Sequence, residues 1–277
     1  MLVNLRDTLQ KALKHNYAVA GLVTLGWEDM MAYVEAAEQE NCPVILQAGP
    51  SCRQHTPLPI LGKMFNYLAD NTTVPVVAHL DHGYSEEECK IAIDSGFSSI
   101  MFDGSRKSLN ENIDQTAKIC EISHSAGVSC EGEIGFVGYS GGEGSAGTDP
   151  EEASRFAIDT NIDAMAISVG NIHLQQNKEG GLDEERIRLI EEVTNIPLVI
   201  HGGSGVPVVQ RTFLSQNSKI CKFNIGTELR SSFGEALRVA VNKDLTRFDR
   251  VQILSDTHRP LVDKTRDVLK ALKPVSS

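Results

Sequence analysis

Three histidines of this 277-residue chain each follow a short apolar run: His82, His173 and His201. Three imidazoles held by rigid elements make a good catalytic metal site, with a fourth position open to water or substrate. The sequence therefore predicts a divalent-metal site, provided that the three runs end at one place in the fold. The alternative is that each histidine is an ordinary polar residue at the start of a loop. His79, in the middle of an apolar run, is not assigned to the metal.

Carboxylates accompany these histidines. Asp81 comes directly before His82, and Asp103 and Glu133 follow two other apolar runs. A divalent ion can polarise a carbonyl and stabilise the enolate that forms when a neighbouring carbon loses its proton. A carboxylate beside the ion can carry protons for an aldol reaction or its reverse. We predict this catalytic role for Asp81; the alternative is a carboxylate that only orients its neighbour.

A tract of small residues, Gly202, Gly203 and Ser204, follows the third histidine, and Asn224 and Thr227 come after the next apolar run. Small residues let backbone N–H groups close on an anion, and a serine adds a hydroxyl. The tract alone is a weak signal, because such sequences are usually plain turns. Its position beside a metal ligand favours a phosphate-binding site.

Eight apolar, β-branched runs are typical of strands that are covered on both faces. They are Ala18–Val23, Pro43–Gln47, Pro75–Leu80, Ser98–Phe102, Val128–Glu131, Ala164–Val169, Pro197–His201 and Lys219–Ile225. Helical stretches alternate with these runs. The pattern predicts an α/β fold of the (β/α)8 or TIM-barrel type. A doubly wound sheet is the rival fold, but it usually has fewer strands and often a glycine-rich turn after the first one, which this sequence lacks.

In such a barrel, polar residues at the C-terminal ends of the strands are the first candidates for chemistry. The histidines, the carboxylates and the glycine tract would then meet at one face. The segment 85–88 (SEEE) is typical of a capping box, and Asp149 and Asp183 each precede acidic residues in the way that helix N-caps do. No linker rich in proline, glycine and serine divides the chain, so we predict a single domain over residues 1–277.

Composition and charge disfavour several classes of partner. Lys plus Arg is 26 and Asp plus Glu is 37, which gives a net charge of −11 and disfavours nucleic acids and anionic membranes as partners. No apolar run approaches the roughly 20 residues that span a bilayer. The six cysteines form no C-x-x-C pair, which favours free thiols in a reducing compartment. We therefore expect a cytoplasmic protein.

With these residues in view, the sequence resembles the class II, metal-dependent ketose-bisphosphate aldolases. The matching tracts are AHLDHG (78–83), FDGS (102–105), EGEIG (131–135), TDPEEA (148–153), GNIH (170–173), HGGSG (201–205) and KFNIGTELR (222–230). They occur in the family's order and nearly at its spacings, so the resemblance covers essentially the whole chain.

The resemblance implies that the three histidines bind zinc and that Asp81 shuttles the proton on the aldehyde-derived oxygen. Asp103 and Glu133 would belong to a second or alternative metal position. The glycine-rich segment 135–147 resembles the family's mobile active-site loop. Glu143 within it would be the base that deprotonates the ketose phosphate.

For the substrate, the resemblance implies binding by Gln47, Gly202, Gly203, Ser204, Asn224 and Thr227. Asn224 would contact the enediolate side, while Ser204 and Thr227 would contact the phosphate. The partner would be a small phosphorylated sugar. Family members are mostly dimers or tetramers, so we expect a homodimer or a homotetramer.

The family pattern is not followed at Val23, Gly49, Leu174 and Gly226, and the family's lysine of this region is displaced by one position, to Lys178. These substitutions remove polar groups or reshape the substrate end, and none of them touches a metal ligand. We therefore expect a phosphorylated ligand but poor cleavage of the usual bisphosphate.

The leading hypothesis is a zinc-dependent aldolase that cleaves a ketose phosphate or bisphosphate into dihydroxyacetone phosphate, or a related enolate-forming fragment, and an aldehyde. Two alternatives remain open. One is a non-catalytic relative that binds sugar phosphates. The other is a metal-dependent hydrolase on the same barrel architecture, although the H-x-H pair typical of such enzymes is absent from the first predicted strand.

Overall fold

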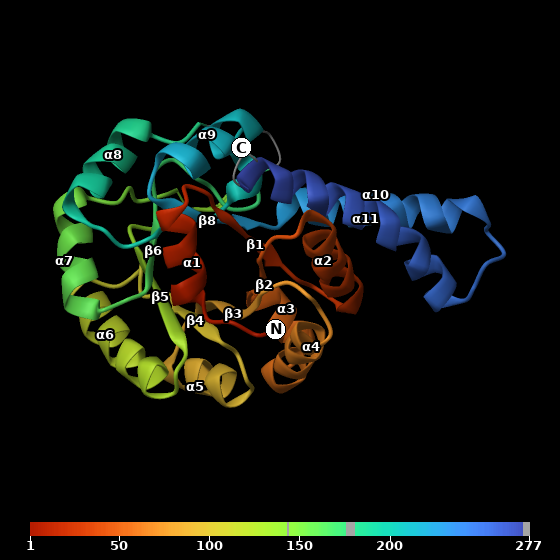
Figure 1. Ribbon diagram of the computed structural model, residues 1–277, viewed down its shortest axis with the longest axis horizontal. Coiled ribbons are helices and arrows are strands. Elements are labelled where there is room, and N and C mark those ends of the chain that lie inside the picture. Colours follow the sequence, from red (N-terminus) through yellow and green to blue (C-terminus); the bar gives the residue numbers. More distant parts are fainter. Residues whose placement is uncertain (143, 176–180, 274–277) are drawn as a thin grey trace.

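The computed structural model describes residues 1–142, 144–175 and 181–273, and these form a closed barrel of eight parallel strands (Figure 1). Each strand pairs with the next one in the sequence, and β8 returns to β1. The strands are β1 (Val19–Val23), β2 (Val44–Ala48), β3 (Val76–Gly83), β4 (Ser99–Phe102), β5 (Ser129–Ile134), β6 (Ala164–Ile167), β7 (Leu198–Ile200) and β8 (Ile220–Ile225). The predicted TIM-barrel fold is confirmed.

Helices surround the barrel (Figure 1). They are α1 (Leu5–Lys14), α2 (Trp27–Glu40), α3 (Pro50–His55), α4 (Leu58–Asp70), α5 (Glu86–Asp94), α6 (Leu109–Ser125), α7 (Pro150–Thr160), α8 (Glu184–Val193), the 3-10 turn η1 (Gly203–Gly205), α9 (Val208–Asn217), α10 (Thr227–Lys243) and α11 (Arg250–Leu272). No helix in the described part of the chain is long and apolar enough to cross a membrane.

The predicted helix starts are also confirmed. Asp149 accepts hydrogen bonds from two backbone N–H groups of α7, and Asp183 accepts one at the start of α8. The Ser85 hydroxyl accepts a bond from the N–H of Glu88 at 3.2 Å, which caps α5. The Glu88 carboxylate does not complete a capping box, because it pairs with Arg53 of α3.

The barrel is closed at its N-terminal end. Leu5, Leu9 and Ala12 of α1 pack against inward-facing residues of the strands, among them Val19 and Ile45. A larger core fills the space between the outer surface of the strands and the helices. The open end is therefore the C-terminal end, where side chains that follow the strands can reach solvent.

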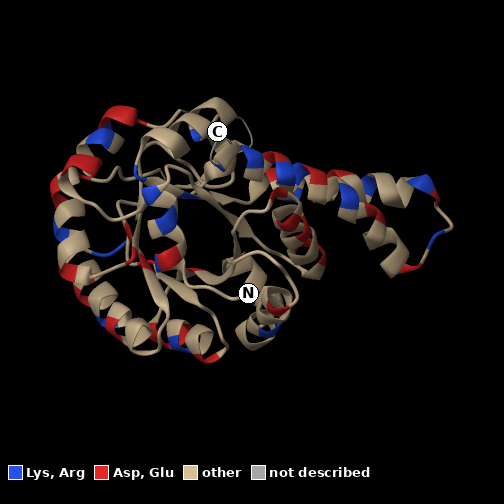
Figure 2. Cartoon of the chain, in the orientation of Figure 1, with Lys and Arg blue, Asp and Glu red and all other residues tan. Residues whose placement is uncertain are grey.

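The last two helices extend beyond the barrel. In Figure 1, α10 and α11 run side by side away from the strands and form an arm. Lys, Arg, Asp and Glu are scattered over the arm and the outer helices, whereas the barrel strands carry few of them (Figure 2).

Candidate active site

The three predicted histidines converge at the C-terminal end of the barrel. His82 lies in β3, His173 in the segment after β6, and His201 directly after β7. The ring centroids are 4.7 Å apart for His82 and His201, 5.2 Å for His82 and His173, and 5.7 Å for His173 and His201. One nitrogen from each ring lies within 4.8 Å of the others, which is close enough for one metal ion to bind all three.

His82 is aimed by an irregular backbone. Its φ angle is +53°, and the pairing between β3 and β4 shifts register between Leu80 and Gly83. Successive side chains of a regular strand point to opposite faces. The left-handed residue breaks this alternation, and both Asp81 and His82 line the same pocket.

Carboxylates orient two of the three rings. His82 Nδ1 lies 2.7 Å from Asp103 Oδ2, and His201 Nε2 lies 3.1 Å from Glu131 Oε1. Ionised carboxylates only accept hydrogen bonds, so each of these nitrogens carries a proton. The remaining nitrogens, His82 Nε2 and His201 Nδ1, then face each other at 3.1 Å. Two facing lone pairs need a cation or a proton between them, so this donor set fits a bound metal ion.

The electrostatics of the cluster also favour a cation. Burial lowers the pKa of His82, but Asp81, Asp103 and Glu133 outweigh it and raise that pKa to about 9. Burial and the charge of Asp103 raise the pKa of Glu133 to about 8. Glu133 Oε2 is buried without a hydrogen-bond partner, and it lies 3.8 Å from His82 Nδ1 and 3.6 Å from His201 Nδ1. With His82 and Asp103, Glu133 forms a second group with metal-ligand spacing.

Asp81 is held by two buried amides. Its Oδ1 accepts hydrogen bonds from Gln47 Nε2 at 3.0 Å and from Asn224 Nδ2 at 3.1 Å. Its Oδ2 lies on the side of Gly49, where an added Cβ would be 3.3 Å away. Burial raises the pKa of this carboxyl, but the nearby His82 and other cationic groups lower it overall. Asp81 is therefore an ionised carboxylate with one fixed oxygen and one oxygen that is not engaged by these amides.

A pocket of about 280 Å³ lies over these groups. Its wall includes Gly202, Ser204, Asn224 and Thr227. The Ser204 hydroxyl oxygen accepts bonds from the N–H groups of Gly226 and Glu228, at 3.2 and 3.3 Å, at the start of α10. Its own proton therefore remains available to an anion.

Not every predicted substrate residue reaches this wall. Gly203 lies behind it, where an added Cβ would be 3.0 Å from the backbone oxygen of Asn224. Gln47 lies beneath Asp81 and is fully buried. Two residues singled out in the sequence fall outside the described residues: Glu143, the predicted base, and Lys178.

Sequence reasoning missed a buried chain of polar groups below the histidines. Glu131 Oε2 accepts a hydrogen bond from Lys222 Nζ at 2.6 Å, Lys222 Nζ lies 3.3 Å from His79 Nε2, and His79 Nδ1 lies 2.8 Å from Ser99 Oγ. This chain fixes the carboxylate that orients His201. A lysine inside an apolar strand was the available signal, since buried lysines are almost always paired.

Two arginines were also missed. Arg53 donates to the backbone oxygens of Asp81, at 2.8 Å, and His82, at 2.5 Å, and so holds the end of β3. Arg230 of α10 lines the pocket, and its Nε is buried without a hydrogen-bond partner. Neither role can be recognised from spacing alone, because both depend on how α3 and α10 sit above the strands.

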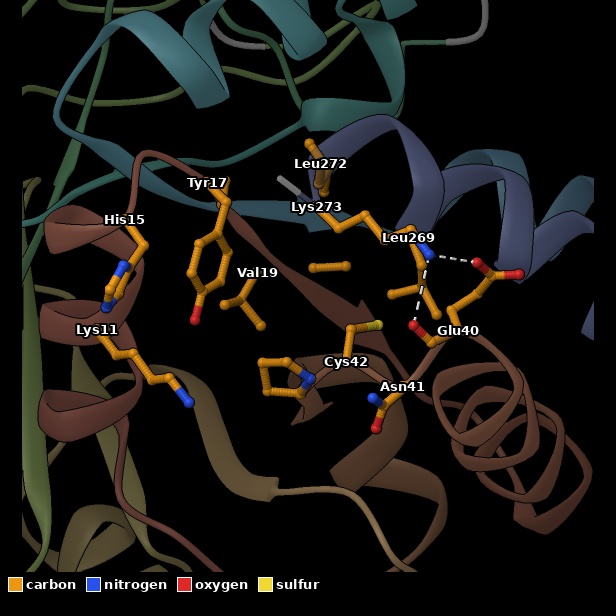
Figure 3. A pocket seen from close by; sticks show the side chains of 13 residues that line it. Lys11, His15, Tyr17, Val19, Glu40, Asn41, Cys42, Leu269, Leu272 and Lys273 are labelled. Carbon is orange, nitrogen blue, oxygen red and sulfur yellow. Dashed lines mark hydrogen bonds and ion pairs between the residues drawn. The ribbon is translucent and has the colours of Figure 1, made fainter. Parts of the chain in front are cut away.

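A larger cavity, of about 580 Å³, opens at the opposite end of the barrel (Figure 3). Lys11, Tyr17 and Cys42 line it, and Lys273 Nζ pairs with Glu40 there at 2.6 Å. None of the predicted site residues belongs to its wall. The convergence of the three predicted histidines, rather than cavity size, therefore identifies the candidate active site.

Comparisons with known proteins agree with this geometry. The sequence model described as "Fructose-bisphosphate aldolase class-II" matches residues 3–275. A fructose-bisphosphate aldolase from Geobacillus stearothermophilus is 36% identical over 279 residues, covering 98% of this chain and 93% of that protein. A 6-phospho-5-dehydro-2-deoxy-D-gluconate aldolase from Shouchella clausii is 36% identical over 266 residues, covering 92% and 88%. The crystal structure of the YdjI aldolase from Escherichia coli K12 superposes with a TM-score of 0.84 at 28% identity, covering 98% and 97%.

Proposed function

Because this chain belongs to the family of class II fructose-bisphosphate aldolases, and is therefore a carbon–carbon lyase, we propose that it cleaves a ketose phosphate with the help of a zinc ion. The products would be dihydroxyacetone phosphate, or a related enolate-forming fragment, and an aldehyde. The observation that carries this proposal is the carboxylate of Asp81, which two amides hold beside the ligand His82.

His82, His173 and His201 would hold the metal ion, with Asp103 and Glu133 as an alternative position. When bound, a divalent cation polarises the ketone and stabilises the enolate fragment. Glu131 and Asp103 fix the ring orientation of two ligands. Such outer partners also raise the basicity of a ligand.

Asp81 moves the proton of the cleavage step. The hydroxyl group on the carbon that becomes the aldehyde gives its proton to Oδ2, while the carbon–carbon bond breaks and its electron pair stays with the ketone fragment. Gln47 and Asn224 keep Oδ1 occupied, so the proton goes to the oxygen that they leave unengaged. We keep Glu143 as the proposed base for proton exchange on the ketone fragment.

The phosphate of the substrate would lie against Gly202, Ser204 and Thr227. The Ser204 hydroxyl can donate to it, because the hydroxyl oxygen already accepts bonds from the N–H groups of Gly226 and Glu228 at the start of α10. The dipole of α10 also favours an anion near the N-terminus of that helix.

Arg230 supports a substrate with a second anionic group. A guanidinium matches a carboxylate or a phosphate through two parallel hydrogen bonds. An added Cβ at Gly226 would lie 3.2 Å from Val23 and 3.8 Å from Arg230 Nε, so the two departures lie beside this cation. The names of two relatives specify a bisphosphate in one case and a phosphorylated gluconate in the other. We propose a substrate of one of these two classes. We also propose that the catalytic efficiency on the family's usual bisphosphate is reduced.

We further propose a cytoplasmic homodimer or homotetramer joined through the arm. Its outer end exposes Leu245, Phe248 and Val251, which are 82%, 94% and 71% accessible. Exposed apolar clusters mark interaction sites. In a two-fold symmetric dimer, the same patch of each subunit can be buried against its copy. The six free cysteines fit a reducing compartment.

An aldol-cleavage screen tests the proposed function. Protein of measured zinc content is mixed with fructose bisphosphate, tagatose bisphosphate, a ketose monophosphate that has no second anionic group, and a phosphorylated keto sugar acid. The released aldehyde is then measured. We expect aldehyde to be released from at least one substrate, and this activity should be lost after zinc is removed. Binding without aldehyde release from zinc-loaded protein would favour the non-catalytic relative, and release of inorganic phosphate instead would favour a hydrolase.

A further inference from the structure

His173 is held differently from the other two histidines. His82 and His201 each have a carboxylate on the nitrogen remote from the cluster. Among the residues that the structure describes, no acidic side chain pairs with the His173 ring. His173 also lies outside the strands, in the segment that follows β6, so the barrel ladder does not fix it.

The glycine-rich loop supplies the missing support. The His173 N–H donates to the backbone oxygen of Gly138 at 2.8 Å, and the Ser140 N–H donates to the backbone oxygen of His173 at 2.9 Å. Between these two bonds, the Tyr139 ring stacks on the His173 imidazole, with centroids 4.8 Å apart and ring planes 27° apart. Tyr139 also lines the pocket.

The loop itself is tied at its base. Phe136 and Ala146 exchange two backbone hydrogen bonds of 2.8 Å, and the Arg106 guanidinium lies 4.2 Å from the centre of the Phe136 ring. The Ser145 hydroxyl accepts a bond from the N–H of Gly138 at 2.9 Å. Tyr139 therefore projects from an anchored support rather than from a free chain.

We propose that Tyr139 is the positioning residue for His173, and that through it the glycine-rich loop sets the geometry of the third metal ligand. This inference rests on the proposed metal-dependent function. The aromatic ring orients the His173 imidazole, as Asp103 and Glu131 orient the other two. The phenol hydroxyl has no part in this role, because the contact is between ring faces.

The ring and the hydroxyl can be separated by substitution. Tyr139→Phe keeps the stacked ring, and Tyr139→Ala removes it. Tyr67→Ala is the matched control, since Tyr67 is 59% accessible and packs on Trp27 away from the site. Zinc affinity is measured by competition with a chelator, and ligand geometry by the visible absorption of the cobalt-loaded protein.

We expect Tyr139→Ala to bind zinc about 10–100-fold more weakly, as is typical when a residue that orients a ligand is lost, and to alter the cobalt spectrum. Tyr139→Phe and Tyr67→Ala should match the wild type in both measurements. An unchanged affinity and spectrum for Tyr139→Ala would overturn the inference, as would an equal loss for Tyr139→Phe.

A second measurement separates this inference from the proposed function. If the wild type takes up no metal, the metal-dependent function fails, and the ring protons of His173 in the metal-free protein then decide the inference. The stacked Tyr139 ring should shift their NMR resonances, and Tyr139→Ala should remove that shift while Tyr139→Phe keeps it. Resonances that do not move in Tyr139→Ala would contradict the positioning role.

Discussion

At the scale of single residues, two adjacent residues, Asp81 and His82, have different proposed roles. Asp81 would move the proton and His82 would bind the metal ion, although adjacent side chains of a strand normally point apart. The positive φ of His82 makes the arrangement possible. Histidine is one of the few residue types that tolerate this backbone region. The site therefore depends on a local irregularity in β3.

Asp81→Asn should test the proton step directly. The amide oxygen can still accept the bonds from Gln47 and Asn224, so fold and metal content should remain. Positioned acid–base groups typically contribute about 10²–10⁴-fold, and we expect a loss of that size in kcat for cleavage. The measurement is aldehyde release at equal zinc content. Near wild-type turnover would show that Asp81 only orients its neighbour.

Metal uptake should release protons at pH 7. His82, with a pKa raised to about 9, and Glu133, with a pKa raised to about 8, both hold a proton there in the metal-free chain. A ligand must be deprotonated before it binds a metal ion. Zinc affinity should therefore weaken as the pH falls below about 9. Calorimetric titration in buffers of different ionisation enthalpy measures the protons, and a value of zero would contradict the assignment.

At the scale of elements, the eight strands could be predicted because apolar, β-branched runs that alternate with helix signals are typical of strands covered on both faces. The C-terminal ends of β3 and β5 could not be predicted. Both strands continue through charged residues, to Gly83 and Ile134, whereas the predicted runs stop at Leu80 and Glu131. Charged residues usually mark the end of a strand in a sheet that is exposed to solvent. Inside this barrel the charged groups pair with one another, so the strands can continue through them.

The candidate site shows the same limit. The histidines and Asp81 were predictable because each follows an apolar run. Glu131 carried a weaker signal, since it alternates with Glu133 and both must face one side of the strand. Arg53 carried none, because its partners lie on two strands and on α5.

The Arg53 clamp gives a prediction at this scale. Its guanidinium binds the backbone oxygens at the end of β3 and pairs with Glu88. Lysine lacks the planar fork, so Arg53→Lys should leave these carbonyls underbonded. We expect zinc affinity to fall roughly 10–100-fold, measured by chelator competition. Glu88→Gln, which keeps the clamp and removes the charge of its partner, should retain most of the affinity; an equal loss would argue against the clamp.

At the scale of the whole molecule, the barrel and the arm have separate surfaces. The barrel is closed by α1 at one end and presents the three clustered histidines at the other. The arm carries its exposed apolar cluster at the end remote from the barrel (Figure 1). Assembly through the arm would leave the active-site end accessible to substrate.

Substitution at the end of the arm should change the assembly and spare the chemistry. In the Leu245→Ser, Phe248→Ser double variant, the apolar patch is lost while the barrel is untouched. We expect sedimentation analysis to show a smaller species than the wild type, with a zinc affinity per chain that is unchanged. An oligomer of wild-type size would show that another surface joins the subunits.

The histidine site also bears on the stability of the folded chain. His82 and His201 are 119 residues apart in the sequence, yet their rings touch. An ion shared between them would act as a removable staple that binds only the folded chain. At a free zinc concentration of a thousand times Kd, it would add about 4 kcal/mol to the free energy of unfolding, or roughly 10 °C in Tm. His201→Ala should abolish this zinc-dependent rise, so that heating curves taken with and without chelator report the staple directly.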